Sequence, residues 1–112
     1  MTTFDDRERA FEKKFAHDEE LRFKSTVRRN KLLGLWAAEK LGLAGAEAES
    51  YAKDVVRADF QQPGDEDIVA KLRADFDAKG VAQSDDQIRL VMLEMMANAV
   101  RQIESEGGKS GS

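Results

Sequence analysis

Residues 84–103, SDDQIRLVMLEMMANAVRQI, contain the strongest helix signal in the chain. They open with a capping box, in which the Ser84 hydroxyl accepts from the Gln87 backbone N–H and the Gln87 side chain accepts from the Ser84 N–H. The apolar residues that follow cover more than one stripe of a helix, so this helix is predicted to be the most buried one. They are Ile88, Leu90, Val91, Met92, Leu93, Met95, Met96, Val100 and Ile103.

Working outward from this helix, helix-breaking residues divide the 112-residue chain into four helix-length segments. Connections of roughly three to five residues place consecutive helices antiparallel, and no alternating strand pattern competes. We therefore predict an all-α fold, a four-helix up-and-down bundle over residues 18–106, with a mobile N-terminal amphipathic arm at 1–17 and a disordered tail at 107–112. The breaks are Gly42 and Gly45, Pro63-Gly64, Gly80 with Ser84, and Gly107-Gly108.

The two middle segments carry their own start and stop signals. One opens at Gly45 and ends where Pro63 cannot continue a helix. The next begins with Asp65 as its predicted N-cap and ends with Gly80 as the residue after its C-cap. Its apolar face is predicted to hold Ile68, Leu72 and Phe76.

The N-terminal arm has a different pattern. Phe4, Phe11 and Phe15 are separated by seven and four residues, which places them on one stripe of a helix, and charged residues cover the rest. Continued along the chain, that stripe would carry Arg22 and Arg29, so it does not extend the core face of the bundle. Full burial of the three rings supplies at most on the order of 11–19 kcal/mol, whereas ordering about fifteen residues costs on the order of 15–30 kcal/mol. The arm therefore needs a partner groove, or docking on its own bundle, to become ordered.

Two N-terminal blocks resemble a known family. The sequence TTFDDRERAFEKKFAHDEELRFK at 2–24, followed by RRNKLLGLWAAE at 28–39, resembles the zeta subunit, the inhibitor protein of F-type ATP synthases in alphaproteobacteria. The likeness continues more loosely through YAKDVV at 51–56 and GDED at 64–67. The resemblance implies a bundle whose mobile N-terminal segment inserts as a helix into an α/β catalytic interface beside the rotating central stalk. Insertion would block rotation in the hydrolytic direction.

The resemblance also implies a site, partners and a location. The partner is the catalytic head of the synthase, with its α, β and central stalk subunits, and the location is cytoplasmic, at the membrane-bound synthase. The chain would be a regulatory inhibitor without catalytic residues and a monomer when free. The implied inhibitory and partner-binding residues are Phe4, Asp5, Asp6, Arg7, Arg9, Phe11, Glu12, Lys13, Lys14 and Phe15.

Composition excludes several other classes. The formal net charge of −4 and pI near 5.1 argue against general binding of nucleic acid. The absence of cysteine excludes disulfides and thiolate metal sites, and we predict no metal. No apolar run approaches the ~18–20 residues of a membrane span, so no membrane insertion is predicted.

A basic region lies behind the arm. Residues 16–31 carry five positive and three negative charges inside an acidic chain. Three interpretations stay open for it: a solvated helix face, a docking surface for an acidic partner, or weak binding of ATP or ADP, with no other cofactor expected. The alternative functions are accordingly a small nucleotide-binding regulatory protein and a helical interaction scaffold without inhibitory activity. The candidate contacts are Arg22, Arg28, Arg29 and Lys31, with Lys24 in the same cluster.

Overall fold

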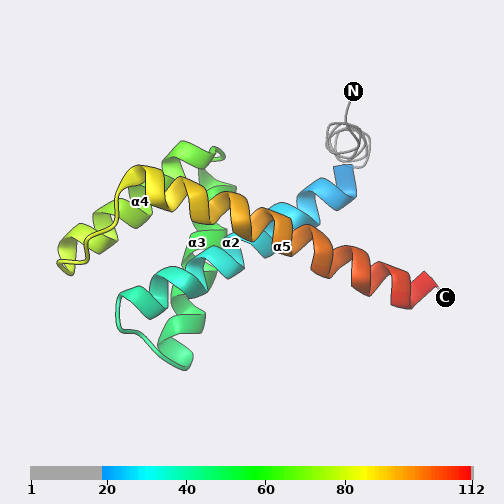
Figure 1. The fold of residues 1–112 in the computed structure, drawn as a ribbon, viewed down its shortest axis with the longest axis horizontal. Helices are drawn as coiled ribbons and strands as arrows, with labels where there is room; N and C mark the ends of the chain where they lie inside the picture. The colour runs from blue at the N-terminus through cyan, green and yellow to red at the C-terminus, as the bar shows by residue number, and fades with distance from the viewer. Residues whose placement is uncertain (1–18, 112) are drawn as a thin grey trace, which may run out of the picture.

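A computed structural model describes residues 19–111, with side chains as far as Glu106. Within this range the chain forms four α-helices and no strand, which confirms the predicted all-α fold (Figure 1). The predicted arm at 1–17 lies outside the described residues. The helices are α2 (Glu19–Lys40), α3 (Ala46–Gln61), α4 (Asp65–Ala78) and α5 (Asp85–Gly111).

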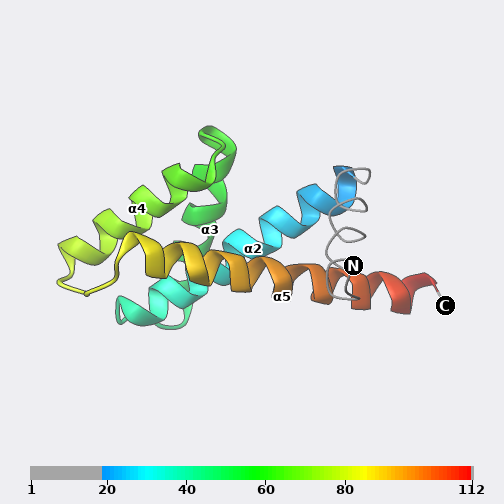
Figure 2. The same cartoon turned by 45° about the horizontal axis from the view of Figure 1, so that its top comes forward.

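Helix α2 is the central packing element, because it contacts both α3 and α5 (Figures 1 and 2). Helix α4 contacts α5 and α3 near the N-terminal end of α5. The C-terminal half of α5 continues past the other helices, on the side of the molecule where α2 begins. One side of the molecule is therefore built mainly by α2, α3 and the C-terminal half of α5.

Most of the predicted helix ends are confirmed. Ser84 and Gln87 form the capping box, with the Ser84 N donating to Gln87 Oε1 at 2.8 Å and the Gln87 N donating to Ser84 Oγ at 3.1 Å. Gly80 follows α4 with φ of 71°, and the Val81 N–H donates to the Phe76 carbonyl at 2.8 Å, which closes the helix in a Schellman motif. The prediction of Asp65 as an N-cap is wrong by one residue. Gly64 caps α4, and Asp65 is its first helical residue, where its charge still favours the helix dipole.

The core lies where all four helices meet. The predicted face of α4, with Ile68, Leu72 and Phe76, is fully buried. The Trp36 ring of α2 meets the Phe76 ring edge-on, with centroids 5.6 Å apart. Further core residues are Leu33 and Ala37 of α2, Val55 of α3, Val69 of α4, and Ile88 and Met92 of α5.

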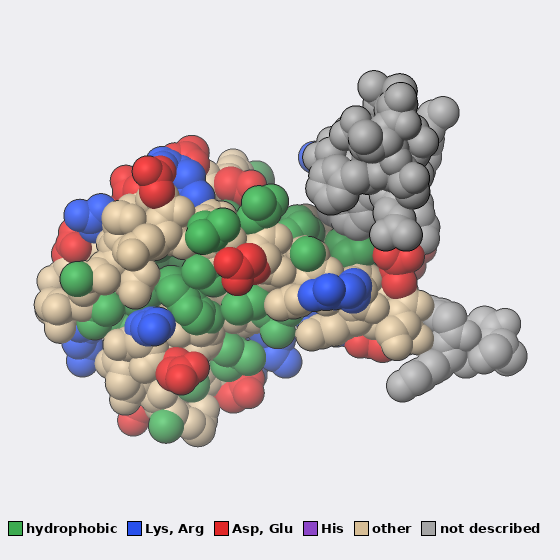
Figure 3. Space-filling view, viewed as in Figure 1, with side chains coloured by type: hydrophobic (Ala, Val, Ile, Leu, Met, Phe, Trp, Pro, Cys, Tyr) green, Lys and Arg blue, Asp and Glu red, His purple; other side chains and the backbone are tan. Residues whose placement is uncertain are grey.

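The prediction that the last helix is the most buried is wrong. Leu90 and Leu93 are 57% and 70% exposed, although Ile88 and Met92 of the same helix are buried. The described contacts of α5 are with α2 and α4, and its apolar residues extend beyond the face that these two helices cover. Hydrophobic side chains are accordingly visible over the middle of one face of the molecule (Figure 3).

The C-terminal end of α5 also differs from the prediction. A disordered tail was predicted after residue 106, but the helical backbone continues to Gly111. No proline interrupts this segment, and a helical glycine costs only about 1 kcal/mol relative to alanine, so a long helix can extend through Gly107 and Gly108.

A hydrogen bond joins α3 to α4 and predicts a dependence of stability on alkaline pH. The Tyr51 hydroxyl donates to Asp75 Oδ2 at 2.6 Å. Burial, reinforced by this bond, raises the pKa of Tyr51 far above its ordinary value of 10. We expect the unfolded chain, but not the folded one, to lose this proton above about pH 10, so the free energy of unfolding should fall as pH rises through that range. Tyr51 is the only tyrosine, so tyrosinate absorbance reports it alone. Tyrosinate that forms near pH 10 while the protein stays folded would contradict the prediction.

A second prediction concerns the contact between α2 and α3. A Cβ added to Gly34 would lie 2.6 Å from the Ala52 Cα, a backbone atom that cannot move aside cheaply. Helix propensity alone would make Gly34→Ala stabilising by about 1 kcal/mol. We expect the opposite, a loss of about 1–3 kcal/mol, because the helices must separate. Urea unfolding followed by fluorescence of Trp36, the only tryptophan, measures the difference. A variant as stable as the parent protein would show that the approach is not tight.

Candidate interaction surface

The predicted inhibitory residues between Phe4 and Phe15 lie outside the described residues. Among the described residues, α2 begins at Glu19. Glu19 and Glu20 occupy the first turn of this helix, where negative charge favours the helix dipole. The chain before these residues therefore connects to the folded body through α2.

The structure does not bring the four basic candidates together. Arg29 is buried, with 4% of its side chain exposed, and its Nη1 lies 3.0 Å from Asp65 Oδ1 at the start of α4. Its Nε donates to Asn30 Oδ1 at 3.1 Å, and its Nη2 has no hydrogen-bond partner among the described residues. Arg29 therefore joins α2 to α4 from inside the fold, whereas Arg22 is exposed.

Arg28 holds the C-terminal half of α5 against α2. Its Nη1 and Nη2 donate to the two carboxylate oxygens of Glu106 at 2.8 and 3.0 Å, and Nη1 also donates to Gln102 Oε1 at 2.9 Å. The hydrogen bond to Glu106 raises the pKa of Arg28 above its ordinary value. This two-bond pair fixes the orientation of the guanidinium and anchors one wall of the groove described next.

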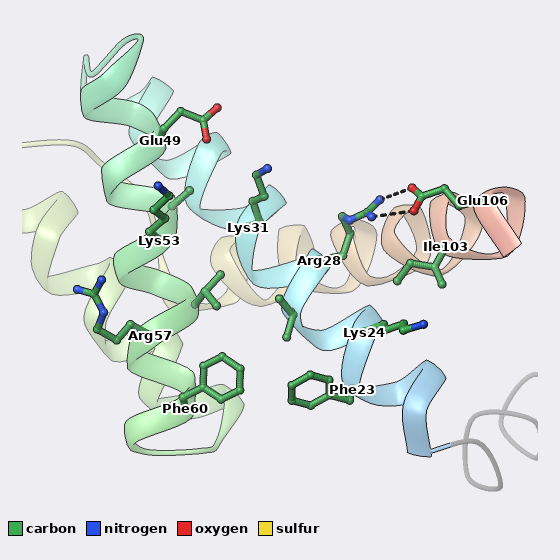
Figure 4. A pocket seen from close by; sticks show the side chains of 13 residues that line it. Phe23, Lys24, Arg28, Lys31, Glu49, Lys53, Arg57, Phe60, Ile103 and Glu106 are labelled. Atoms are coloured by element: carbon green, nitrogen blue, oxygen red, sulfur yellow. Dashed lines mark hydrogen bonds and ion pairs between the residues drawn. The ribbon is translucent and has the colours of Figure 1, made fainter. Parts of the chain in front are cut away.

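A groove of about 910 Å³ opens between α2, α3 and α5, and we call it the α2–α3 groove (Figure 4). Phe23 of α2 and Phe60 of α3 form one end of it, with ring centroids 5.7 Å apart and 57% of each residue exposed. Side chains this apolar and this exposed are what a binding surface offers to a partner. The apolar lining is Phe23, Val27, Ala52, Val56, Phe60 and Ile103.

Basic side chains surround this apolar lining. Lys31 of α2 and Lys53 of α3 are exposed and have no ion-pair partner within residues 19–106, whereas Arg57 lies 3.4 Å from Asp54. The lining contains five basic residues against two acidic ones, in a chain that is acidic as a whole. The basic residues are Lys24, Arg28, Lys31, Lys53 and Arg57, and the acidic ones are Glu49 and Glu106.

The sequence analysis missed the α3 wall of this groove, although the chain holds a signal for it. Lys24, Val27 and Arg28 have the same spacing as Lys53, Val56 and Arg57, so the pattern Lys-x-x-Val-Arg occurs once in each helix. Residues three and four apart share a helix face, so each pattern sets a valine between two cations. The structure turns both faces to the same groove.

Other kinds of site are not seen in the described part of the chain. No three His, Cys, Asp or Glu side chains among residues 19–106 are grouped as a metal site would need. None of the four described helices combines the length and the apolar character that crossing a membrane requires.

Four packed helices and the groove between α2 and α3 define a class, that of small all-α proteins with an amphipathic groove on their surface. Residues 1–102 match the model of the family described as ATPase inhibitor subunit zeta, and the chain belongs to that family. Its role is accordingly that of an inhibitor of the ATP synthase.

A solved structure supports the relationship. It was determined by solution NMR, its sequence is 43% identical, and it superposes with a TM-score of 0.68. The alignment covers 77% of this chain and 98% of that one. No curated protein matches the chain.

The Arg28–Glu106 pair gives a prediction about local stability. Glu106→Gln removes one charge from a pair that is partly exposed, so the global free energy of unfolding should change by less than about 1 kcal/mol. The anchored end of α5 should open more often, and the backbone amides of residues 102–106 should exchange hydrogen faster. Glu94→Gln, an exposed change on the same helix, is the matched control. Equal exchange rates in the two variants would mean that the pair does not hold this end of α5.

Proposed function

We propose that the chain inhibits ATP hydrolysis by the F-type ATP synthase by inserting residues 1–17, as a helix, into an α/β catalytic interface, where it blocks rotation of the central stalk. The observation that carries the proposal is the extent of the family match, which begins at residue 1 and therefore includes the amphipathic segment. The chain would act as a regulatory subunit, not as an enzyme, in the cytoplasm at the membrane-bound synthase.

The sequence of the segment supports insertion. Phe4, Phe11 and Phe15 share one stripe, and the eight charged residues among the first fifteen are evenly divided between acids and bases. A helix of this kind suits a crevice between two subunits, which can bury the rings and pair both signs of charge. Because ordering the segment costs about as much as the rings return, it gains structure only where the partner supplies further contacts.

The attachment point also supports this proposal. The segment leads into α2 at Glu19, so the inserted helix would stay close to the folded body. The body is then held beside the crevice and would add bulk outside it.

Weak binding of ATP or ADP at Arg22, Arg28, Arg29 and Lys31 stays a prediction. Arg28 and Arg29 already form ion pairs, so a nucleotide there would compete with Glu106 and Asp65.

The proposal is tested by adding the full chain to a purified catalytic head and measuring ATP hydrolysis. Deletion of residues 1–15 should abolish inhibition, because the inserted element is gone. Far-ultraviolet circular dichroism and Trp36 fluorescence of the shortened protein should still report a folded helical body.

A double substitution tests the same segment without shortening the chain. Phe11→Ala with Phe15→Ala should raise the concentration needed for half-inhibition by about a hundredfold or more, since each buried ring stabilises a complex by on the order of 1.5–3 kcal/mol and every 1.4 kcal/mol is about tenfold. Leu93→Ala, which removes an exposed apolar side chain from α5, is the control and should inhibit normally. A chain without residues 1–15 that still stops hydrolysis would refute the proposed role of this segment.

A further inference from the structure

We infer that the α2–α3 groove is a second binding site for the same partner, and that it holds an amphipathic helix of the catalytic head with an apolar stripe and carboxylates on its flanks. This inference deepens the proposed function and rests on it. It assigns a binding role to the folded body, in addition to the role proposed for residues 1–17.

The apolar lining sets the first requirement for the occupant. Phe23 and Phe60 lie at one end of the groove with over half of each residue exposed, and Val27, Val56 and Ile103 line the remainder. A groove walled by two helices is the shape that accepts the apolar face of a third helix, and such ligands anchor through side chains three or four residues apart. The groove therefore fits a helix with at least two apolar anchors.

The charges set the second requirement. Three of the five lining cations already have a carboxylate partner, since Lys24 pairs with Glu20 at 2.9 Å, Arg28 with Glu106 at 2.8 Å and Arg57 with Asp54 at 3.4 Å. Lys31 of α2 and Lys53 of α3 lie on the two walls of the groove and have no ion-pair partner within residues 19–106 (Figure 4). Carboxylates on the flanks of a bound helix would pair with Lys31 and Lys53, one cation from each wall.

The position of the groove limits which surface of a partner it can contact. Phe23 lies four residues after Glu19, which is about 6 Å along α2 at 1.5 Å per residue. If residues 1–17 are inserted in the catalytic head, the end of the groove must lie against the surface that surrounds the crevice. The surface beside that crevice is then within reach of the groove, and a helix of that surface is the occupant that we infer.

Two other occupants are less suited to it. The first fifteen residues carry four acids and four bases, so the N-terminal segment matches the apolar lining but not the excess of cations around it. A second copy of the chain related by two-fold symmetry would place one basic groove against another. The charges of Lys31 and Lys53, which have no ion-pair partner within residues 19–106, therefore favour an acidic surface on another protein.

The test uses charge reversal with a matched control. Lys31→Glu with Lys53→Glu changes both unpaired lysines of the groove, and Lys40→Glu with Lys79→Glu changes two exposed lysines that do not line it. Both variants alter the net charge equally. We expect the groove variant to bind the catalytic head about tenfold more weakly, with a shallower dependence of the dissociation constant on salt, and the control variant to bind like the parent protein. At saturating concentration the groove variant should still stop hydrolysis, since residues 1–17 are intact.

The apolar requirement has its own pair of variants. Phe60→Ser removes an exposed ring from the groove, and Leu93→Ser removes an exposed side chain from outside it. We expect weaker binding to the head, by about tenfold, in the first variant only. Thermal unfolding of all four variants verifies that the differences do not come from loss of the fold.

The outcomes separate this inference from the proposed function. Equal affinity of the groove and control variants for the head would overturn the groove as a binding site, whether or not the chain inhibits. Binding that depends on the groove, in a chain that does not inhibit hydrolysis, would leave this site standing and refute the insertion mechanism. If the amide resonances of residues 1–17 differ between the free groove variant and the free parent protein, the groove holds the chain's own segment. If the molecular mass in solution rises with concentration in the parent protein only, the groove holds a second copy. Either of these last results would overturn the inference.

Discussion

The close approach of α2 to α3 at Gly34 is the contact on which the rest of the structure depends. With no side chain at that position, the α2 backbone lies directly against Ala52, and a Cβ there would be 2.6 Å from the Ala52 Cα. The two walls of the groove extend from this contact. One follows α2 back to Phe23 and the other follows α3 forward to Phe60, where the two rings meet. A larger residue at 34 would separate the helices, widen the groove and move both Lys-x-x-Val-Arg faces. The shape of the groove thus depends on one small residue that does not line it.

Local signals were enough to predict most of the fold. The capping box at Ser84 and the glycine after α4 act within a few residues of chain, so their outcome depends little on the remainder of the protein. Burial along α5, in contrast, depends on which of its faces the other helices cover. Leu90 and Ile88 are equally apolar and two residues apart, yet one is mostly exposed and the other fully buried, because only one of them faces the neighbouring helices. A count of apolar residues on a helix cannot show how many sides of it will be covered.

The site was harder to predict for the same physical reason. The cluster of cations on α2 was found in the sequence, but it combined side chains that the fold sends in different directions, with Arg29 into the interior and Arg28 to the groove. The other half of the surface comes from α3, and only the packing of the two helices brings Lys53 and Arg57 to the same groove as Lys31 and Lys24. The repeated Lys-x-x-Val-Arg pattern is a sequence signal for this arrangement, but its meaning depends on knowing that the two helices are neighbours. The inhibitory role of the N-terminal segment stays a prediction, and it rests on the resemblance to the zeta family, which does not depend on tertiary contacts.

Binding through the groove would change the free energy of inserting residues 1–17 into the catalytic head. Three phenylalanine rings supply at most on the order of 11–19 kcal/mol, against an ordering cost of similar size for the segment that carries them. Once the groove holds the folded body on the head, insertion of residues 1–17 becomes an intramolecular step. The segment then reaches the crevice at an effective concentration in the millimolar range for a short connection, instead of at the concentration of free protein. A segment too weak to bind alone can then be an effective inhibitor, and it can still leave the crevice without the body leaving the synthase. Affinity and inhibition would then be set by different parts of the chain, the first largely by the groove and the second by the N-terminal helix.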